Sequence, residues 1–300
     1  MKFDINAIPS TLARNVVAAA AVFAGALFSV SAGAVDSFTA TYKNGTSCGS
    51  TYNITGREPT AAGTYPVFIY TVGTTEPYTS SIAIAAIEGM ANRGFVAVTV
   101  DYPHSNFGNC STLTGRAKCI FDGTNANSAI NQVCARGKAD CSKGVVVGGF
   151  SQGSIMATLA NNYDSRIRAA YGMGTHTKYS FYDLSSCMTN GNHTITNDRL
   201  RIVNGEVDTY GGGNASAVRT QAQLVTGYSC GSSAYSCLQT NGSGWYMIAN
   251  GQVQDGSADH CYMLNGGCTF SKPLDQGWPS GPDAWELNAN LDWLKGFVTP

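Results

Sequence analysis

The chain has 300 residues and a formal net charge of −1 at pH 7, and only 12% of its residues are charged. A near-neutral chain without a basic excess is not typical of nucleic-acid-binding proteins, so we expect no nucleic-acid partner. The length suits one α/β domain with a sizeable core, and no linker or internal repeat divides the chain.

The first predicted element is an apolar segment at residues 16–30, which follows two basic residues and ends near Ala32-Gly33-Ala34. This pattern is typical of a secretory signal peptide. We therefore assign residues 1–34 to the leader and 35–300 to a mature domain, and we expect the protein to be secreted. The alternative is a membrane anchor, but the run is shorter than the roughly 20 residues of a membrane span, so we expect no stable membrane insertion.

All ten cysteines follow residue 34, which fits an oxidising compartment and up to five disulfides. Spacing alone does not determine the pairing. Close neighbours along the chain are Cys110/Cys119, Cys134/Cys141, Cys230/Cys237 and Cys261/Cys268, which would leave Cys48 with Cys187. Zinc is the alternative use of cysteines, but no C-x-x-C pair occurs and the four histidines are scattered, so we expect no metal site.

Beyond the leader, predicted strands and helices alternate. The first two strands flank the loop 45–49 as a hairpin. The further strands are expected at 66–72, 94–100, 145–148, 167–172, 200–204 and 245–249, and the helices at 82–91, 126–135, 155–160, 215–225 and 285–297. This order predicts an α/β fold with a mainly parallel central sheet, helices on both faces and the hairpin at one edge. Reactive residues are expected at the carboxyl ends of the strands.

The pentapeptide 149–153 has the pattern G-x-S-x-G and lies between the apolar run 145–148 and a helix-forming stretch. This is the strand-turn-helix setting of a nucleophile elbow, in which a sharp turn exposes one hydroxyl. Glycines are needed on both sides because a Cβ there would collide with the adjoining strand or helix. Ser151 is therefore the candidate nucleophile, and an ordinary strand-to-helix turn is the alternative.

The same pattern occurs twice more, at residues 45–49 and 227–231. The first copy reads as the hairpin loop and is not followed by a helix. The second closes a predicted helix, with Gly227 as its C-cap, and is not preceded by a strand. Both copies also hold a cysteine that a secreted protein would use in a disulfide.

A serine hydroxyl needs an imidazole to take its proton and a carboxylate to orient that imidazole. Asp208 is predicted in the loop after the strand 200–204, and His260 in the loop after the last strand, which completes the order Ser, Asp, His. Glu206 is the alternative acid, but it lies closer to the strand end, where a side chain would point away. His176 as the base would require a different order.

On these residues the chain resembles the α/β-hydrolase superfamily, in its secreted esterase, lipase and cutinase-like branch. The resemblance covers residues 65–300 and is carried by the elbow, by Gly205-Glu206-Val207-Asp208 and by His260. It implies an α/β-hydrolase fold in which Ser151 is the nucleophile, His260 the general base and then acid, and Asp208 the orienting carboxylate. It implies no cofactor.

The tetrahedral intermediate needs two N–H donors for its oxyanion. Gln152 would provide the first, because it follows the nucleophile at a helix N-terminus. By the resemblance, the second comes from the loop after the strand that ends at Val72. Thr74 is the best candidate and Thr75 the second, and an ordinary surface loop is the alternative.

Several aromatic residues fall in loops expected on or near the catalytic face: Tyr78, Tyr102, Tyr210, Tyr262 and Trp278. Of these we expect Tyr78 and Tyr210 to contact substrate, together with His176. The sequence thus predicts a secreted serine hydrolase, a monomer, that acts on soluble carboxylic esters or on an insoluble polyester or lipid, without a metal or cofactor. The alternatives are a peptidase with the same triad and a noncatalytic binding protein on the same fold.

Overall fold

The computed structural model describes residues 34–45 and 48–299, which lie within a single structural unit. The signal peptide predicted at 1–34 lies outside these residues, apart from Ala34. In the described ranges, no helix combines the length and apolar character that a membrane crossing requires.

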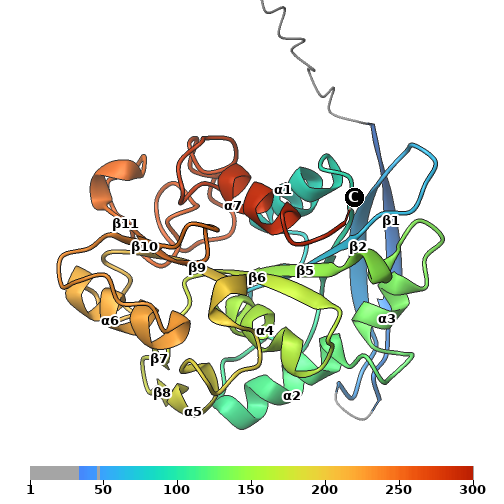
Figure 1. Cartoon of the computed structure of the whole chain (residues 1–300), viewed down its shortest axis with the longest axis horizontal. Coiled ribbons are helices and arrows are strands. Elements are labelled where there is room, and N and C mark those ends of the chain that lie inside the picture. The colour runs from blue at the N-terminus through green and yellow to red at the C-terminus, as the bar shows by residue number, and fades with distance from the viewer. Residues whose placement is uncertain (1–33, 46–47, 300) are drawn as a thin grey trace, which may run out of the picture. The chain divides into compact units, whose positions relative to one another are not determined.

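The described chain builds an α/β domain around one large sheet of nine strands, in the order β1-β2-β4-β3-β5-β6-β9-β11-β10 (Figure 1). The strands are β1 (Val35–Tyr42), β2 (Tyr52–Pro59), β3 (Val67–Thr71), β4 (Val96–Val100), β5 (Val145–Phe150), β6 (Ile167–Met173), β9 (Leu200–Gly205), β10 (Ser236–Leu238) and β11 (Gly244–Ile248). The six strands from β4 to β11 in this order run parallel. The hairpin β1-β2 and the short β10 add antiparallel edges.

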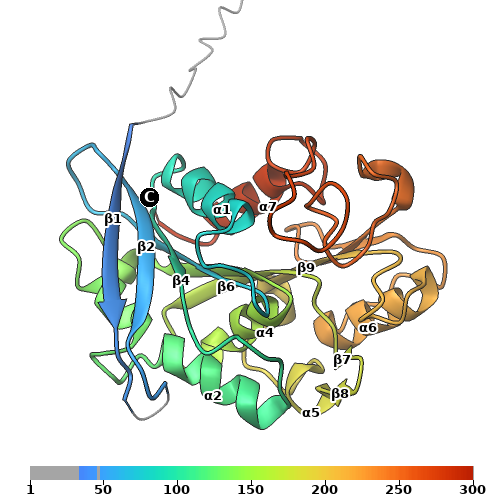
Figure 2. The same ribbon diagram turned by 180° about the vertical axis from the view of Figure 1, so that it is seen from behind.

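Helices cover both faces of the sheet. On one face lie α1 (Ser81–Ala91) and α7 (Leu287–Lys295); on the other lie α2 (Cys110–Phe121), α4 (Gln152–Leu159) and α6 (Ala215–Thr226) (Figure 2). Two shorter helices are α3 (Ala129–Cys134) and α5 (Ser185–Met188), and a separate two-stranded hairpin joins β7 (Lys178–Tyr179) to β8 (Tyr182–Asp183). The prediction of a mainly parallel sheet with helices on both faces is confirmed.

The central strands form where the sequence has continuous apolar runs. Every residue of β3, β4 and β5 is buried, as expected for parallel strands covered on both faces. The helix α2, which contains Thr, Gly and Lys residues, was not predicted from the sequence. Its buried side chains Leu113, Ala117 and Ile120 nevertheless lie on one helical face, and the Asn109 side chain caps its first turn by accepting from the Thr112 N–H at 3.1 Å.

The ten cysteines form five disulfides, of which three join the expected neighbours: Cys134–Cys141, Cys230–Cys237 and Cys261–Cys268. The other two expected pairs are wrong. Cys110 and Cys119 lie at opposite ends of α2, about 13 Å apart at 1.5 Å per residue, which is too far for a disulfide. Cys48 pairs instead with Cys119, and Cys110 with Cys187.

The direction of the chain connections reverses between the central strands β3 and β5. β3 has β4 on one side and β5 on the other, so the connections leave β3 and β5 in opposite directions. In open α/β sheets, ligands bind outside the carboxyl ends of strands at such a reversal point. Here these ends are Thr71 and Phe150, directly before the loop of Thr74 and the elbow of Ser151.

Candidate active site

Ser151 occupies a sharp turn between β5 and α4, with a backbone φ of 52° and ψ of −118°. A non-glycine residue adopts a positive φ only at a cost, which the surrounding structure must offset. The two flanking glycines make the turn feasible. A Cβ on Gly153 would lie 1.9 Å from the Thr71 carbonyl oxygen, and one on Gly149 would lie 2.4 Å from the Gly153 carbonyl oxygen. The predicted reason for both glycines therefore holds.

Asp208 and His260 meet because β9 ends in a glycine. A Cβ on Gly205 would lie 2.0 Å from the Ala258 carbonyl oxygen, so only glycine allows the 258–260 segment to pack against this strand end. The Val207 N–H donates to the Ala258 carbonyl at 3.1 Å, which joins the two loops. The His260 Nδ1 then lies 2.7 Å from the Asp208 Oδ2.

The Asp208 carboxylate is fully buried and accepts hydrogen bonds on both oxygens. Besides His260 on Oδ2, the Tyr210 N–H donates to Oδ1 at 2.9 Å. Burial by itself raises the pKa of Asp208, but His260 and a second imidazole, His176, together with their hydrogen bonds, outweigh it and hold the pKa well below its usual range. Asp208 is therefore an anion at neutral pH.

Glu206, the alternative acid, is engaged elsewhere. Its Oε1 accepts the Asn250 N–H at 2.6 Å and its Oε2 accepts the Tyr235 hydroxyl at 2.5 Å. The structure thus brings Asp208, and not Glu206, to His260.

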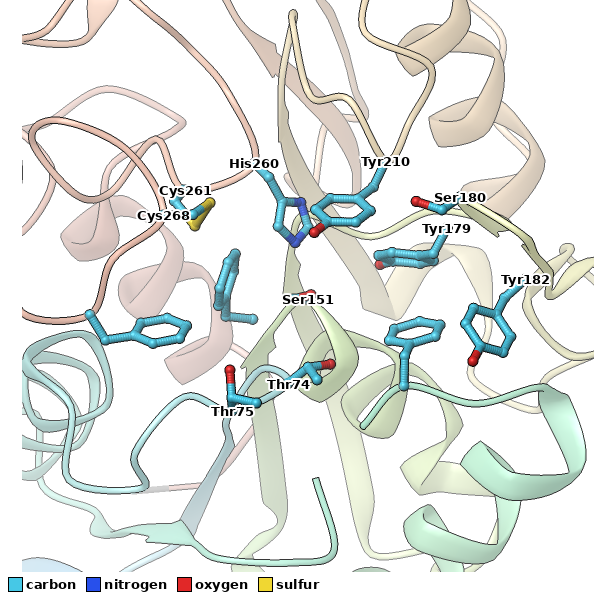
Figure 3. Close-up of a pocket in the computed structure, with 13 residues that line it drawn as sticks. Thr74, Thr75, Ser151, Tyr179, Ser180, Tyr182, Tyr210, His260, Cys261 and Cys268 are labelled. Carbon is cyan, nitrogen blue, oxygen red and sulfur yellow. A yellow bond between two sulfur atoms is a disulfide. The ribbon is translucent and has the colours of Figure 1, made fainter. Parts of the chain in front are cut away.

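His260 turns its second nitrogen toward Ser151 (Figure 3). This Nε2 is buried and has no hydrogen-bond partner among the described residues, and both side chains line the same cavity. The ring of Tyr210 holds the imidazole in place at a centroid distance of 4.6 Å, and that of Phe150 at 4.9 Å. Because Asp208 accepts the proton of Nδ1, Nε2 carries the lone pair that can accept a proton.

Of the two expected oxyanion donors, Thr74 lines the same cavity, and Gln152 directly follows the lining residue Ser151. Gln152 is the first residue of α4, where N–H groups have no acceptor within the helix. Its side-chain Nε2 donates to the Thr74 Oγ1 at 2.9 Å, which ties the two segments together. Thr75, the second candidate, donates its own N–H to the His104 carbonyl at 3.0 Å, so this N–H is not free to donate to an oxyanion.

Two buried charged residues that were not predicted from the sequence support this loop. The Glu76 carboxylate accepts the Gly73 N–H at 2.6 Å and the Ser80 hydroxyl at 2.5 Å. Burial raises the pKa of Glu76 to about 7, although these two hydrogen bonds act in the opposite direction. Arg116 donates to the Gln152 Oε1 at 3.0 Å. A lone acid four residues after a buried strand was the available signal for Glu76.

The cavity has a volume of about 250 Å³ and lies over the elbow (Figure 3). The disulfide Cys261–Cys268 forms part of its wall, next to His260. Much of the remaining lining is aromatic: Phe107, Phe150, Tyr179, Tyr182, Tyr210 and Phe270. The β7-β8 hairpin contributes Tyr179, Ser180 and Tyr182.

The expected substrate contacts are only partly where the sequence placed them. Tyr210 lines the cavity, as expected. Tyr78 does not; it borders a separate hollow next to β1 and β2. His176 is fully buried behind Asp208, so its expected contact with substrate is wrong. The other aromatic residues considered are also buried, namely Tyr102, Tyr262 and Trp278.

Within the described ranges, one group of possible metal ligands lies close together: His176, Asp208 and His260, whose ligand atoms are within 4.8 Å of one another. The imidazole nitrogens are 2.8 and 2.7 Å from the Asp208 Oδ2. Ligand atoms around a tetrahedral zinc ion with bonds of 2.0–2.1 Å would be about 3.3 Å apart. The geometry is that of two N–H donors on one carboxylate oxygen.

No protein-family model and no curated protein matches the chain. Among solved structures, a hypothetical protein from Pseudomonas aeruginosa aligns with 20% sequence identity and a TM-score of 0.38. The alignment covers 56% of this chain and 50% of that chain, so it spans about half the length of the matched protein. A likeness at this level carries no argument about fold family or function.

Proposed function

We propose that the protein is a serine hydrolase of the α/β-hydrolase fold that cleaves carboxylic esters through an acyl-enzyme. One observation carries the proposal: the His260 Nδ1 is bonded to a buried carboxylate, and its unpartnered Nε2 faces a serine in a strained strand-to-helix turn. The five disulfides are consistent with an oxidising compartment, and we further propose that the protein acts after export.

In the proposed mechanism, the His260 Nε2 accepts the proton of the Ser151 Oγ as that oxygen attacks the ester carbonyl carbon. The N–H groups of Thr74 and Gln152 donate to the resulting oxyanion. His260 then gives its proton to the leaving alcohol, which departs as the acyl-enzyme forms. A water molecule, deprotonated by the same nitrogen, attacks the acyl-enzyme, and His260 then returns this proton to the Ser151 Oγ as the acid is released.

The aromatic lining supports an ester with an apolar or aromatic acyl group, or an extended polyester chain, as substrate. Phe181, at the tip of the β7-β8 hairpin between the lining residues Ser180 and Tyr182, is fully exposed beside this cavity. An exposed aromatic at the rim is suited to contact an apolar substrate surface.

We expect Ser151→Ala to lower kcat for ester hydrolysis by a factor on the order of 10⁴ to 10⁶ and to abolish labelling by a fluorophosphonate. The substitution removes the nucleophile, and with it the route to an acyl-enzyme. The matched control is Ser229→Ala, which alters the same five-residue pattern in an exposed loop.

The substrate panel comprises p-nitrophenyl esters of increasing chain length, a polyester film and a peptide anilide. The proposal fails if every ester is left intact by the unaltered protein, or if Ser229→Ala is the inactive variant. Cleavage of the anilide alone would indicate a peptidase, and binding without turnover would indicate a noncatalytic protein.

A further inference from the structure

A second histidine shares the carboxylate of the proposed triad. The His176 Nε2 lies 2.8 Å from the Asp208 Oδ2, the same oxygen that is 2.7 Å from the His260 Nδ1. A serine hydrolase triad needs one imidazole on its carboxylate, so the mechanism above leaves His176 without a role.

Two side chains hold the backbone at His176 in place. Its own N–H donates to the Tyr179 hydroxyl at 3.2 Å, and the neighbouring Thr175 N–H donates to the Asn204 side chain on β9 at 2.7 Å. The ring packs directly on Gly211, where a Cβ would lie 2.5 Å from the His176 Cε1. The imidazole is therefore fixed against the loop that carries Asp208.

The hydrogen-bond pattern assigns the tautomer of His176. Asp208 is an anion and accepts, so Nε2 carries the proton. The other nitrogen, Nδ1, is buried without a partner in the described chain. A protonated ring would bury an N–H with no acceptor, which costs more than an unused lone pair. His176 is thus a neutral donor.

We propose that His176 is a positioning residue, which donates to the Asp208 oxygen that His260 uses, fixes that carboxylate and weakens its attraction for the His260 proton. The inference rests on the proposed function. A carboxylate oxygen that accepts two N–H groups has less negative charge available for each of them. Without His176, His260 would be easier to protonate. A higher pH would then be needed before His260 could act as a base.

Other titratable groups near the two imidazoles do not provide the same effect. The Asp259 carboxylate, next to His260, accepts the Cys261 N–H at 2.7 Å. Burial raises the pKa of Tyr179 and of Tyr262, so both phenols stay neutral over the working range. His176→Phe would leave all three in place and remove only the second donor on Asp208.

The test compares His176→Phe with His176→Gln, whose side-chain amide can again donate to Asp208. For His176→Phe we expect the plateau of kcat/KM for a p-nitrophenyl ester to fall about tenfold and the midpoint of its pH profile to rise by roughly one unit. His176→Gln should restore most of both. The matched control is His193→Phe, a buried histidine bonded to the carbonyls of Ile195 and Val225, which should leave the midpoint unchanged.

An unchanged midpoint in folded His176→Phe, or equal profiles for the Phe and Gln variants, would overturn the inference. Nitrogen-15 histidine NMR on the unaltered protein provides a readout without turnover. We expect His176 to carry its proton on Nε2, and a His176 ring protonated on Nδ1 would contradict this. If the protein hydrolyses no ester, the proposed function fails. The NMR result still decides whether His176 and His260 both donate to Asp208.

Discussion

At the scale of single residues, Asp208 determines whether His260 presents a lone pair to Ser151. Asp208→Asn replaces one oxygen by an NH2 group, which cannot accept from an imidazole N–H. We expect kcat to fall by about 10⁴, because His260 would then be held in the wrong tautomer. Steady-state hydrolysis of the best ester from the panel measures this.

The control for this substitution is Glu206→Gln, two residues earlier. Glu206 accepts from Asn250 and Tyr235 and does not contact the triad, so kcat should stay within a factor of about two. A large loss in Glu206→Gln with little loss in Asp208→Asn would reverse the assignment of the acid.

At the scale of elements, the disulfide Cys261–Cys268 closes the loop that begins directly after His260. Opening so short a loop lowers the free energy of unfolding by only about 2 to 3 kcal/mol in the chain-entropy model. A base displaced by about 1 Å can cost roughly 100-fold in rate. We therefore expect the double Ser variant of this pair to lose kcat by about that factor, with a modest drop in Tm.

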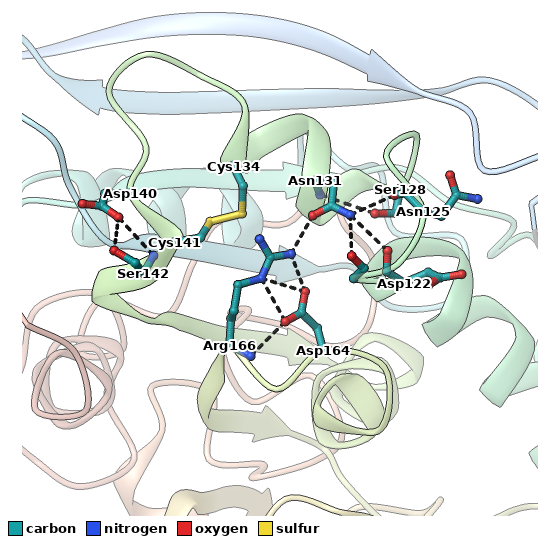
Figure 4. The surroundings of a disulfide bond; sticks show 11 residues. Asp122, Asn125, Ser128, Asn131, Cys134, Asp140, Cys141, Ser142, Asp164 and Arg166 are labelled. Atoms are coloured by element: carbon teal, nitrogen blue, oxygen red, sulfur yellow. Dashed lines mark hydrogen bonds and ion pairs between the residues drawn. A yellow bond between two sulfur atoms is a disulfide. The ribbon is translucent and has the colours of Figure 1, made fainter.

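Cys134–Cys141 (Figure 4) is the matched control, because both disulfides have a sequence separation of 7. It lies next to the start of β5, at the strand end opposite Ser151. Its double Ser variant should show a similar drop in Tm without loss of kcat. Equal turnover in the two variants would show that Cys261–Cys268 stabilises its loop without positioning His260.

At the scale of the whole molecule, Glu76 links stability to pH. Its pKa is raised from an ordinary 4.5 to about 7 in the folded state, so between these values the folded chain binds more protons than the unfolded chain. The free energy of unfolding should therefore fall as pH rises from about 4.5 to 7, by an amount on the order of 3 kcal/mol. Urea denaturation at several pH values measures this slope.

Glu76→Gln removes the ionisation and should flatten the curve over this window. Asp208 has the opposite sign, because its lowered pKa contributes stability that is lost only as pH falls below its ordinary range. The two effects therefore occupy different parts of the pH scale. A Glu76→Gln curve as steep as that of the unaltered chain would contradict the assignment.

Much of this architecture follows from local sequence. Continuous apolar runs predicted β3, β4 and β5, because parallel strands covered on both faces have no polar side. The glycines around Ser151 predicted the elbow because their pattern lies directly between an apolar run and a helix-forming stretch, although the contact that requires Gly153 is with Thr71 on β3. The helix α2 escaped prediction because its apolar side chains are few and become a buried face only when packed.

Long-range contacts decided the rest. Sequence position favoured Asp208 over Glu206 as the acid, and the approach of the 258–260 segment to the end of β9 brings Asp208 to His260. In the sequence His176 is only a loop residue, and the fold brings it to Asp208. Cys110 and Cys119 are close in sequence, but the helix α2 holds them apart. Sequence patterns thus determined most of the elements and the position of the elbow at Ser151, because these depend on local periodicity and turn geometry. The tertiary structure alone decided that His176 shares the Asp208 carboxylate and that Cys119 and Cys110 pair with Cys48 and Cys187, because such contacts form only when separate segments pack together.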